Sequence, residues 1–214
     1  MRYLIVCGGK IDKEFGLNEI KTDGIDAIIA ADSGMDFLYE NGVTPDIIVG
    51  DFDSTTTNAL EYFERKGQTE IRRLNPIKDD TDTEYAIRLA ISEGARSIVL
   101  LGATGSRIDH VLGNISLLGI GLESGTDISI IDTNNRMRMA DKPVTIEKSA
   151  QYGRFVSLIA LTDDNEVSLK GFKYPVTDYS FDRFTSLGIS NEIVDDHALI
   201  DIHRGKFIII ESKD

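Results

Sequence analysis

Short apolar runs and longer amphipathic stretches alternate along the first two thirds of the chain. Five brief apolar runs predict buried strands, at residues 3–7, 27–31, 47–49, 97–101 and 128–131. Three stretches between them predict helices, each followed by a glycine, at residues 35–41, 56–66 and 83–93. Strands that alternate with helices predict an α/β domain with a doubly wound, mostly parallel sheet covered on both faces.

The last third of the chain has a different pattern, with no convincing helix from about residue 134 onward. Residues 154–161 and 167–172 predict strands, and residues 199–211 predict a β-hairpin that turns at an Arg-Gly pair. This pattern indicates a small antiparallel β-sandwich or barrel. The predicted domains are therefore residues 1–138 and 139–214.

Composition narrows the class of protein. With 214 residues, 41% of them hydrophobic, the chain can bury a real core. Its 23 basic and 36 acidic residues give a net charge of −13, which argues against a nucleic-acid binder. No apolar run approaches the ~20 residues of a membrane helix. The single cysteine, Cys7, excludes a disulfide framework and favours a reduced, cytoplasmic setting.

Small and acidic residues follow four of the predicted strands. Ligands bind beyond the carboxyl ends of parallel strands, so these residues are the first candidates for a site. They are Gly8, Gly9 and Lys10, then Asp32, Ser33 and Gly34, then residues 50–54, and finally residues 102–107 with Asp109. Any one of these loops is also explained by the ordinary needs of a turn. Four of them at one sheet edge favour a ligand site.

The aspartates form two short clusters, Asp46, Asp51 and Asp53 in one, and Asp79, Asp80 and Asp82 in the other. Crowded like charges repel unless a cation lies among them. Ligands that are all oxygen favour a hard ion, and Mg²⁺ usually carries substrate phosphates with it. The second cluster also fits a helix N-terminus. Both interpretations can hold if Thr81 or Asp82 caps the helix while Asp80 faces the metal.

Residues 102–107, Gly-Ala-Thr-Gly-Ser-Arg, can present backbone N–H groups to phosphate oxygens, and Arg107 can bind them in a bidentate manner. The chain has neither a P-loop nor a G-x-G-x-x-G fingerprint. Its histidines, His110, His197 and His203, have no metal-binding spacing, and no Ser-His-Asp pattern stands out. Cys7 ends a buried strand and is expected to serve packing.

Several segments, taken in order, resemble the thiamine pyrophosphokinases, also called thiamine diphosphokinases. The resemblance covers nearly the whole chain. The most specific segments are the Gly-Asp-Phe-Asp-Ser run at 50–54 and the Arg-Ile-Asp-His-Val-Leu-Gly-Asn run at 107–114. They are accompanied by residues 31–34, 45–49, 78–84, 171–175 and 187–192.

The resemblance implies a reaction and an architecture. The hydroxyl of thiamine attacks the β-phosphorus of ATP, so that thiamine diphosphate forms and AMP leaves. An N-terminal α/β domain would bind ATP and Mg²⁺. A C-terminal β-sandwich would bind thiamine and form a homodimer, with each active site built between two subunits.

The resemblance also assigns roles to residues. The implied metal ligands are Asp51, Asp53 and Asp82, with Asp46 and Asp80 next. The implied catalytic residues are Asp53, Asp80, Asp82 and Arg107, and Asp53 and Asp80 are the candidates for taking the thiamine proton. The implied nucleotide contacts are Gly8, Gly9, Asp32, Ser33, Gly34, Thr104, Gly105, Ser106, Arg107, Asp109, His110 and Asn114, of which Asn114 should help to hold its loop. The implied thiamine contacts are Tyr174, Ser190 and Asn191.

Tyr174 stands where the family often has a tryptophan, and this chain has no tryptophan. An aromatic face there suits the cationic thiazolium ring, although a core or interface aromatic would look the same in the sequence. Two other functions stay open. One is a pyrophosphokinase for another small alcohol, such as a hydroxymethyl pterin. The other is a nucleotide-sensing module that binds Mg-ATP without turnover.

Overall fold

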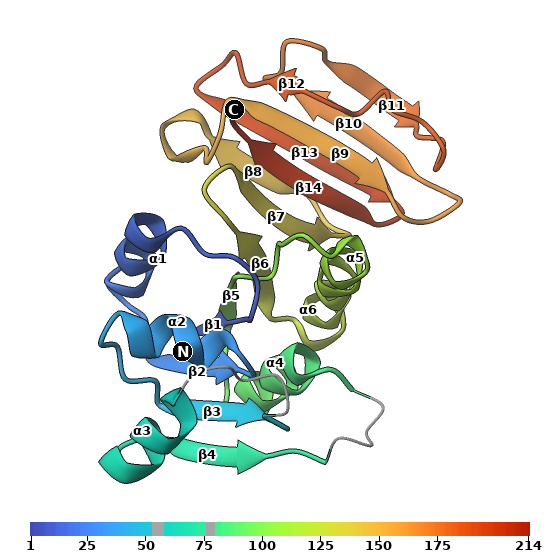
Figure 1. The fold of residues 1–214 in the computed structure, drawn as a ribbon. Helices are drawn as coiled ribbons and strands as arrows, with labels where there is room; N and C mark the ends of the chain where they lie inside the picture. Colours follow the sequence, from blue (N-terminus) through green and yellow to red (C-terminus); the bar gives the residue numbers. More distant parts are fainter. Residues whose placement is uncertain (53–57, 76–79) are drawn as a thin grey trace. The chain divides into compact units, whose positions relative to one another are not determined.

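A computed structural model describes residues 1–52, 58–75 and 80–214 of the chain. The fold divides into two compact parts, Met1–Thr133 and Asn134–Asp214, which we call unit 1 and unit 2 (Figure 1). The sequence-based division lies nearby, after residue 138.

Unit 1 is built on a parallel sheet. Its strands, in chain order, are β1 (Arg2–Val6), β2 (Ala27–Ala31), β3 (Ile47–Gly50), β4 (Glu70–Arg73), β5 (Ser97–Leu101) and β6 (Asp127–Ile131). They lie side by side in the order β6-β5-β1-β2-β3-β4, and each neighbouring pair is parallel. The predicted doubly wound sheet is confirmed. The strand order reverses between β1 and β5, which is where such sheets bind ligands.

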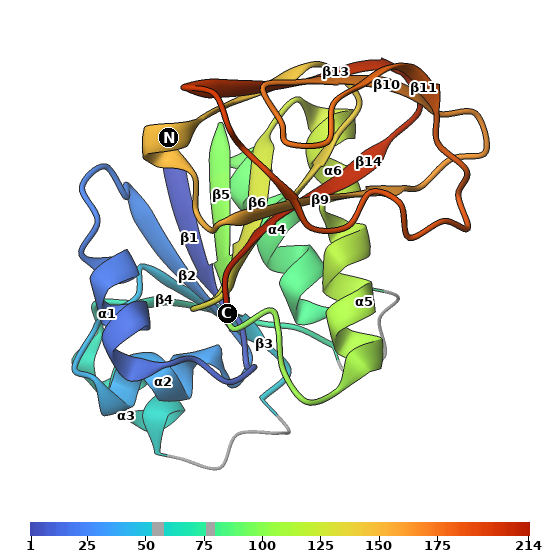
Figure 2. The same ribbon diagram turned by 90° about the horizontal axis from the view of Figure 1, so that it is seen from above.

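Helices cover both faces of this sheet. They are α1 (Lys13–Ile20), α2 (Gly34–Glu40), α3 (Ala59–Lys66), α4 (Asp82–Ser92), α5 (Ile108–Leu117) and α6 (Gly119–Ser124). Figure 2 shows α1, α2 and α3 on one face and α4, α5 and α6 on the other. The core beneath the first group joins Leu4 and Val6 of β1 to Met35 of α2 and Phe63 of α3. Apolar burial therefore fixes α2 and α3 against the sheet.

Unit 2 is an antiparallel β-sandwich. One sheet has the order β12-β9-β14-β7, and the other has the order β11-β10-β13-β8. The strands are β7 (Asn135–Ala140), β8 (Val144–Glu147), β9 (Phe155–Ala160), β10 (Glu166–Lys170), β11 (Val176–Ser180), β12 (Asn191–Glu192), β13 (His197–Arg204) and β14 (Phe207–Ser212). A single 3₁₀ turn, η1 (Lys148–Ala150), follows β8. Buried side chains from both sheets form one core, as expected of two sheets packed face to face.

The predicted hairpin at residues 199–211 is wrong. Both strands exist, but β13 pairs with β8 and β10, whereas β14 pairs with β7 and β9. The chain turns at Gly205, which has a φ of 89°, and passes from one sheet to the other. Alternating apolar residues predict an inward face but do not distinguish a neighbour in the same sheet from one across the core.

Among the described residues, none of the helices combines the length and apolar character needed to span a bilayer.

Candidate functional site

Three aspartates from separate segments meet at the carboxyl edge of the unit 1 sheet. Asp32 directly follows β2, Asp51 directly follows β3, and Asp82 is the first residue of α4. One carboxylate oxygen from each of them lies within 4.8 Å of the other two. All three residues are partly buried. An all-oxygen group of this kind suits a hard cation such as Mg²⁺.

Unusual backbone conformations direct the first two of these residues. Asp32 has a φ of 48°, and its N–H donates to the Val49 carbonyl at 2.7 Å, which links the end of β2 to β3. Aspartate tolerates this left-handed region. Phe52, directly after Asp51, has a φ of 64°, which a bulky side chain rarely adopts. Such residues cluster at functional sites, where the surrounding structure holds them in place.

The helix that begins at Asp82 has a separate cap. The Thr81 hydroxyl accepts a hydrogen bond from the Glu84 N–H at 3.2 Å, so Thr81 is the N-cap of α4. Of the two capping candidates in the sequence, the structure therefore selects Thr81. Asp82 lies in the first turn of α4, where the helix dipole favours acidic residues.

Not every predicted metal ligand lies with this group. Asp46 precedes β3, at the opposite end of the strand, and its carboxylate accepts the Ile28 N–H at 2.8 Å. The four residues of β3 separate Asp46 from Asp51, and five steps along an extended chain span about 16 Å, so the assignment of Asp46 to this group is corrected. Asp80 is exposed just before α4 and is not part of the group of three. Asp53 and Asp79 lie outside the described residues.

The glycines after the strands are required by close packing of the backbone. The Gly9 N–H donates to the Gly102 carbonyl at 2.8 Å, and a Cβ at Gly9 would lie 2.3 Å from that oxygen. A Cβ at Gly34 would lie 1.9 Å from the Val6 carbonyl. The exposed Gly8 is less constrained, because a Cβ there would meet chiefly the side chain of Ser33. The structure thus gives Gly9 and Gly34 packing roles, whether or not they also contact a nucleotide.

The loop after β5 leads to an exposed ion pair. The Arg107 guanidinium donates to both oxygens of Asp109, at 2.6 and 3.3 Å. This contact raises the pKa of Arg107 and lowers the pKa of Asp109. Both side chains are about two-thirds exposed, at 68% and 64%, so water and phosphate can reach them. His110, Gly105 and Ser106 are also exposed here.

Two side chains fasten this loop. Asn114 on α5 donates to the Ala103 carbonyl at 2.8 Å, so it holds the loop as the resemblance implied. The Thr104 hydroxyl donates to Asp132 at 3.0 Å. Asp132 directly follows β6 and was missed, although the same rule of reading the residue after each strand would have found it. A small cavity of about 40 Å³ lies beside it, lined partly by Phe15, Gly102 and Asp132.

Cys7 has the packing role that was expected. The residue is 3% exposed, and its sulfur accepts a hydrogen bond from the Thr83 hydroxyl at 3.7 Å. Burial raises the pKa of the Cys7 thiol to about 11, so the thiol is protonated and unreactive at neutral pH.

In unit 2, the predicted thiamine residues lie together. Asn191 is buried, and its side-chain oxygen accepts the Tyr174 N–H at 3.0 Å while its amide donates to the Tyr174 carbonyl at 2.9 Å. Tyr174 itself is an exposed residue, at 61%. Ser190 has a φ of 61°, and its N–H donates to the Ser157 hydroxyl at 3.0 Å. Asn191 therefore positions Tyr174 through its backbone.

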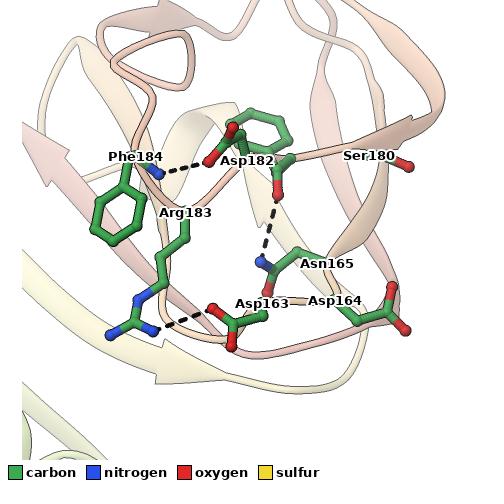
Figure 3. A pocket seen from close by; sticks show the side chains of 8 residues that line it. Asp163, Asp164, Asn165, Ser180, Asp182, Arg183 and Phe184 are labelled. Atoms are coloured by element: carbon green, nitrogen blue, oxygen red, sulfur yellow. Dashed lines mark hydrogen bonds and ion pairs between the residues drawn. The ribbon is translucent and has the colours of Figure 1, made fainter.

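A separate hollow of about 470 Å³ lies elsewhere on unit 2 (Figure 3). Arg183 pairs with Asp163 at 3.1 Å across it, and the Phe184 N–H donates to Asp182 at 2.9 Å. None of the predicted site residues lines this hollow. Its size alone does not make it the candidate site.

Fold and site together define a class of protein. It is a two-part α/β protein with carboxylates gathered at the carboxyl edge of a doubly wound sheet, where proteins of this architecture bind ligands. Comparison with known proteins gives the family. The model of the thiamin pyrophosphokinase catalytic domain matches residues 21–130, and that of the thiamin pyrophosphokinase vitamin B1 binding domain matches residues 143–207.

Individual relatives agree with these matches. The chain is 34% identical over 188 residues to the thiamine pyrophosphokinase of Bacillus subtilis, covering 87% of each. The crystal structure of thiamine pyrophosphokinase from Bacillus subtilis superposes with a TM-score of 0.89, at 31% identity over 100% of both chains. The crystal structure of thiamin pyrophosphokinase from Geobacillus thermodenitrificans superposes with a TM-score of 0.87, at 29% identity, and the match covers 100% of this chain and 98% of that one. The chain belongs to the thiamine pyrophosphokinase family, whose reaction transfers the pyrophosphoryl group of ATP to thiamine.

Proposed function

We propose that unit 1 holds Mg-ATP at the group formed by Asp32, Asp51 and Asp82, and that the chain transfers the pyrophosphoryl group from there to thiamine. The observation that carries this proposal is the convergence of those three carboxylates within 4.8 Å. The donor set fits Mg²⁺, because it is hard, anionic and all oxygen. Bound there, the ion would neutralise charge on the phosphate oxygens of the nucleotide.

Residues of the loop after β5 and the start of α5 are proposed to bind and orient the phosphates. Arg107 is proposed to exchange its bidentate contact with Asp109 for a contact with phosphate. The exchange costs little, because water screens an ion pair between exposed side chains and such pairs add little to stability. Asn114 keeps the loop in place through the Ala103 carbonyl. In such transfers, positioning and charge stabilisation supply most of the rate enhancement.

The resemblance adds further proposed roles on either side of the transferred group. Asp53 and Asp80 are proposed at the phosphate site, and either is proposed to take the proton of the thiamine hydroxyl. Gly8, Ser33, Thr104, Gly105, Ser106 and His110 are proposed nucleotide contacts.

We propose that thiamine binds on unit 2, with its thiazolium ring against Tyr174. The exposed ring offers a π-face to a permanent cation. Ser190 lies beside the buried Asn191 and is proposed to bond the aminopyrimidine, while Asn191 acts mainly through Tyr174.

We also propose a cytoplasmic homodimer in which each active site draws on two subunits. The family resemblance suggests this arrangement, and α5 supports it. None of the residues of α5 is fully buried, and Ile108 and Leu112, one helical turn apart, are 67% and 59% exposed. Light scattering coupled to size-exclusion chromatography tests the proposal, and a mass near 23.6 kDa at micromolar concentration would reject it.

The reaction is tested by incubating the chain with ATP, MgCl₂ and thiamine. AMP and thiamine diphosphate should appear in equal amounts, and chelation of the metal should abolish both. Release of ADP, or AMP formed equally fast without thiamine, rejects the assignment. Turnover of a hydroxymethyl pterin in place of thiamine would instead indicate a pyrophosphokinase that acts on another small alcohol. Mg-ATP binding without turnover would indicate a nucleotide-sensing module.

A further inference from the structure

The segment that carries Tyr174 is fixed along its backbone. Phe172 forms a β-bridge with Ile193, and the Lys173 N–H donates to the Glu192 carbonyl at 2.8 Å. The side chain of Asn191 binds both backbone groups of Tyr174. Pro175 follows and restricts the conformation of the preceding residue. The tyrosine ring is therefore presented to solvent from a rigid base.

One face of this ring already has a cation beside it. The Lys173 ammonium lies 5.6 Å from the centre of the Tyr174 ring. The same ammonium donates to one oxygen of Glu192 at 2.8 Å, and Arg154 donates to the other oxygen at 2.9 Å. Glu192 thus holds Lys173 in place over the ring and offsets its charge.

These contacts have an electrostatic consequence for a second cation. A cationic ligand on the opposite face would be repelled by an uncompensated ammonium within 6 Å of the same ring. Lys173 and Arg154 lower the pKa of the Glu192 carboxyl, which supplies the negative charge that partly offsets these two cations. A neutral ligand of the same shape would not need this compensating negative charge.

We propose that Lys173 closes one face of Tyr174, and that Glu192 acts as a specificity residue by allowing the free face to accept a cationic ring. This inference rests on the proposed binding of thiamine at Tyr174. Glu192 is assigned an indirect role: it acts through Lys173 and touches no reacting atom. Its effect is therefore expected in the KM for cationic substrates, with kcat little changed.

The test compares thiamine with its neutral isostere, in which a carbon atom replaces the thiazolium nitrogen. Glu192→Gln should raise the KM for thiamine roughly three- to tenfold and leave the KM for the isostere and for ATP nearly unchanged. Glu166→Gln is the matched control, because Glu166 pairs with Arg204 at 2.7 Å and its side chain is 24% exposed, against 21% for Glu192. This control should affect neither KM.

A second variant guards against a merely structural effect. Lys173→Met added to Glu192→Gln should recover most of the lost affinity for thiamine, because the uncompensated ammonium is gone. Equal rises in KM for thiamine and the isostere would overturn the inference, as would a double variant no better than Glu192→Gln alone. A wild-type enzyme that forms no AMP with either substrate would overturn the proposed function itself, and the inference with it.

Discussion

Asp51 is the residue on which the proposed metal site is most directly tested. Asp51→Asn removes one anionic ligand and should lower kcat at least about a hundredfold. The same change relieves repulsion among Asp32, Asp51 and Asp82, so the melting temperature should stay equal or rise. Activity against Mg²⁺ concentration and thermal unfolding without metal are the two measurements.

Asp26→Asn is the control for this variant. Asp26 lies before β2, at the opposite end of that strand from Asp32, and its carboxylate accepts the Arg2 N–H at 2.7 Å. This control should retain normal turnover. If Asp51→Asn also retained it, Asp51 would have no metal role.

Cys7 makes the stability of the protein depend on alkaline pH. Its pKa of about 11 in the fold exceeds the value of about 8.5 for an unfolded thiol. The contribution of this difference is complete below pH 8.5 and declines as pH rises toward 11, because the unfolded chain then loses its proton first. Between pH 7.5 and pH 10, wild type should lose about 2 kcal/mol of unfolding free energy more than Cys7→Ala does.

Urea unfolding at both pH values checks this prediction. Other groups also make stability depend on alkaline pH, Tyr3 among them, since burial raises its pKa in the fold, but they are common to both proteins. Equal losses in wild type and Cys7→Ala would show that the thiol does not carry the effect.

At the scale of elements, the sequence predicted the strands with continuous apolar runs and missed elements whose pattern is mixed. The predicted parallel strands were found because their apolar runs are buried on both faces. The edge strand β4 was missed, since Glu-Ile-Arg-Arg is largely charged. Helix α5 was missed as well, and none of its side chains is fully buried.

The positions of residues relative to the strands explain which parts of the candidate site were predicted correctly. Asp32 and Asp51 were singled out because each follows a strand, and parallel strands end at one edge. Asp46 was misplaced because nearness to Asp51 along the chain was taken as nearness in space, although β3 separates the two. The packing role of Gly9 depends on carbonyls of the loop after β5, which no local pattern reveals.

Gly205 controls the passage of the chain from β13 to β14. Its φ is 89°, and an added Cβ would lie 2.2 Å from the side-chain oxygen of the buried Asn165. Gly205→Ala should therefore cost about 2–4 kcal/mol of unfolding free energy, from backbone strain and a steric clash together.

Gly125→Ala separates the two causes. Gly125 has a φ of 73°, but an added Cβ would meet nothing within 4 Å, so only the strain of about 1–2 kcal/mol applies. Chemical denaturation of both variants gives the difference. A loss at Gly205 no greater than at Gly125 would mean that Asn165 moves aside at no cost.

At the scale of the whole molecule, the net charge of −13 acts in opposite directions on the two substrates. Thiamine is a cation and is attracted by the field of the protein, whereas Mg-ATP remains an anion and is repelled. Salt screens both effects, since the Debye length is about 10 Å at 0.1 M and shortens further as salt is added. Raising NaCl from 20 to 200 mM should therefore raise the KM for thiamine and lower the KM for Mg-ATP.

Each KM is measured with the other substrate and Mg²⁺ saturating, so that only one encounter is affected at a time. The neutral isostere of thiamine is the control, and its KM should not follow the salt concentration. Shifts of both KM values in the same direction would contradict the argument, because a general effect of salt on the enzyme does not distinguish a cation from an anion. Opposite shifts of the two KM values would mean that the negative net charge favours the binding of thiamine. They would also mean that the site at the sheet edge binds the triphosphate despite repulsion by that net charge.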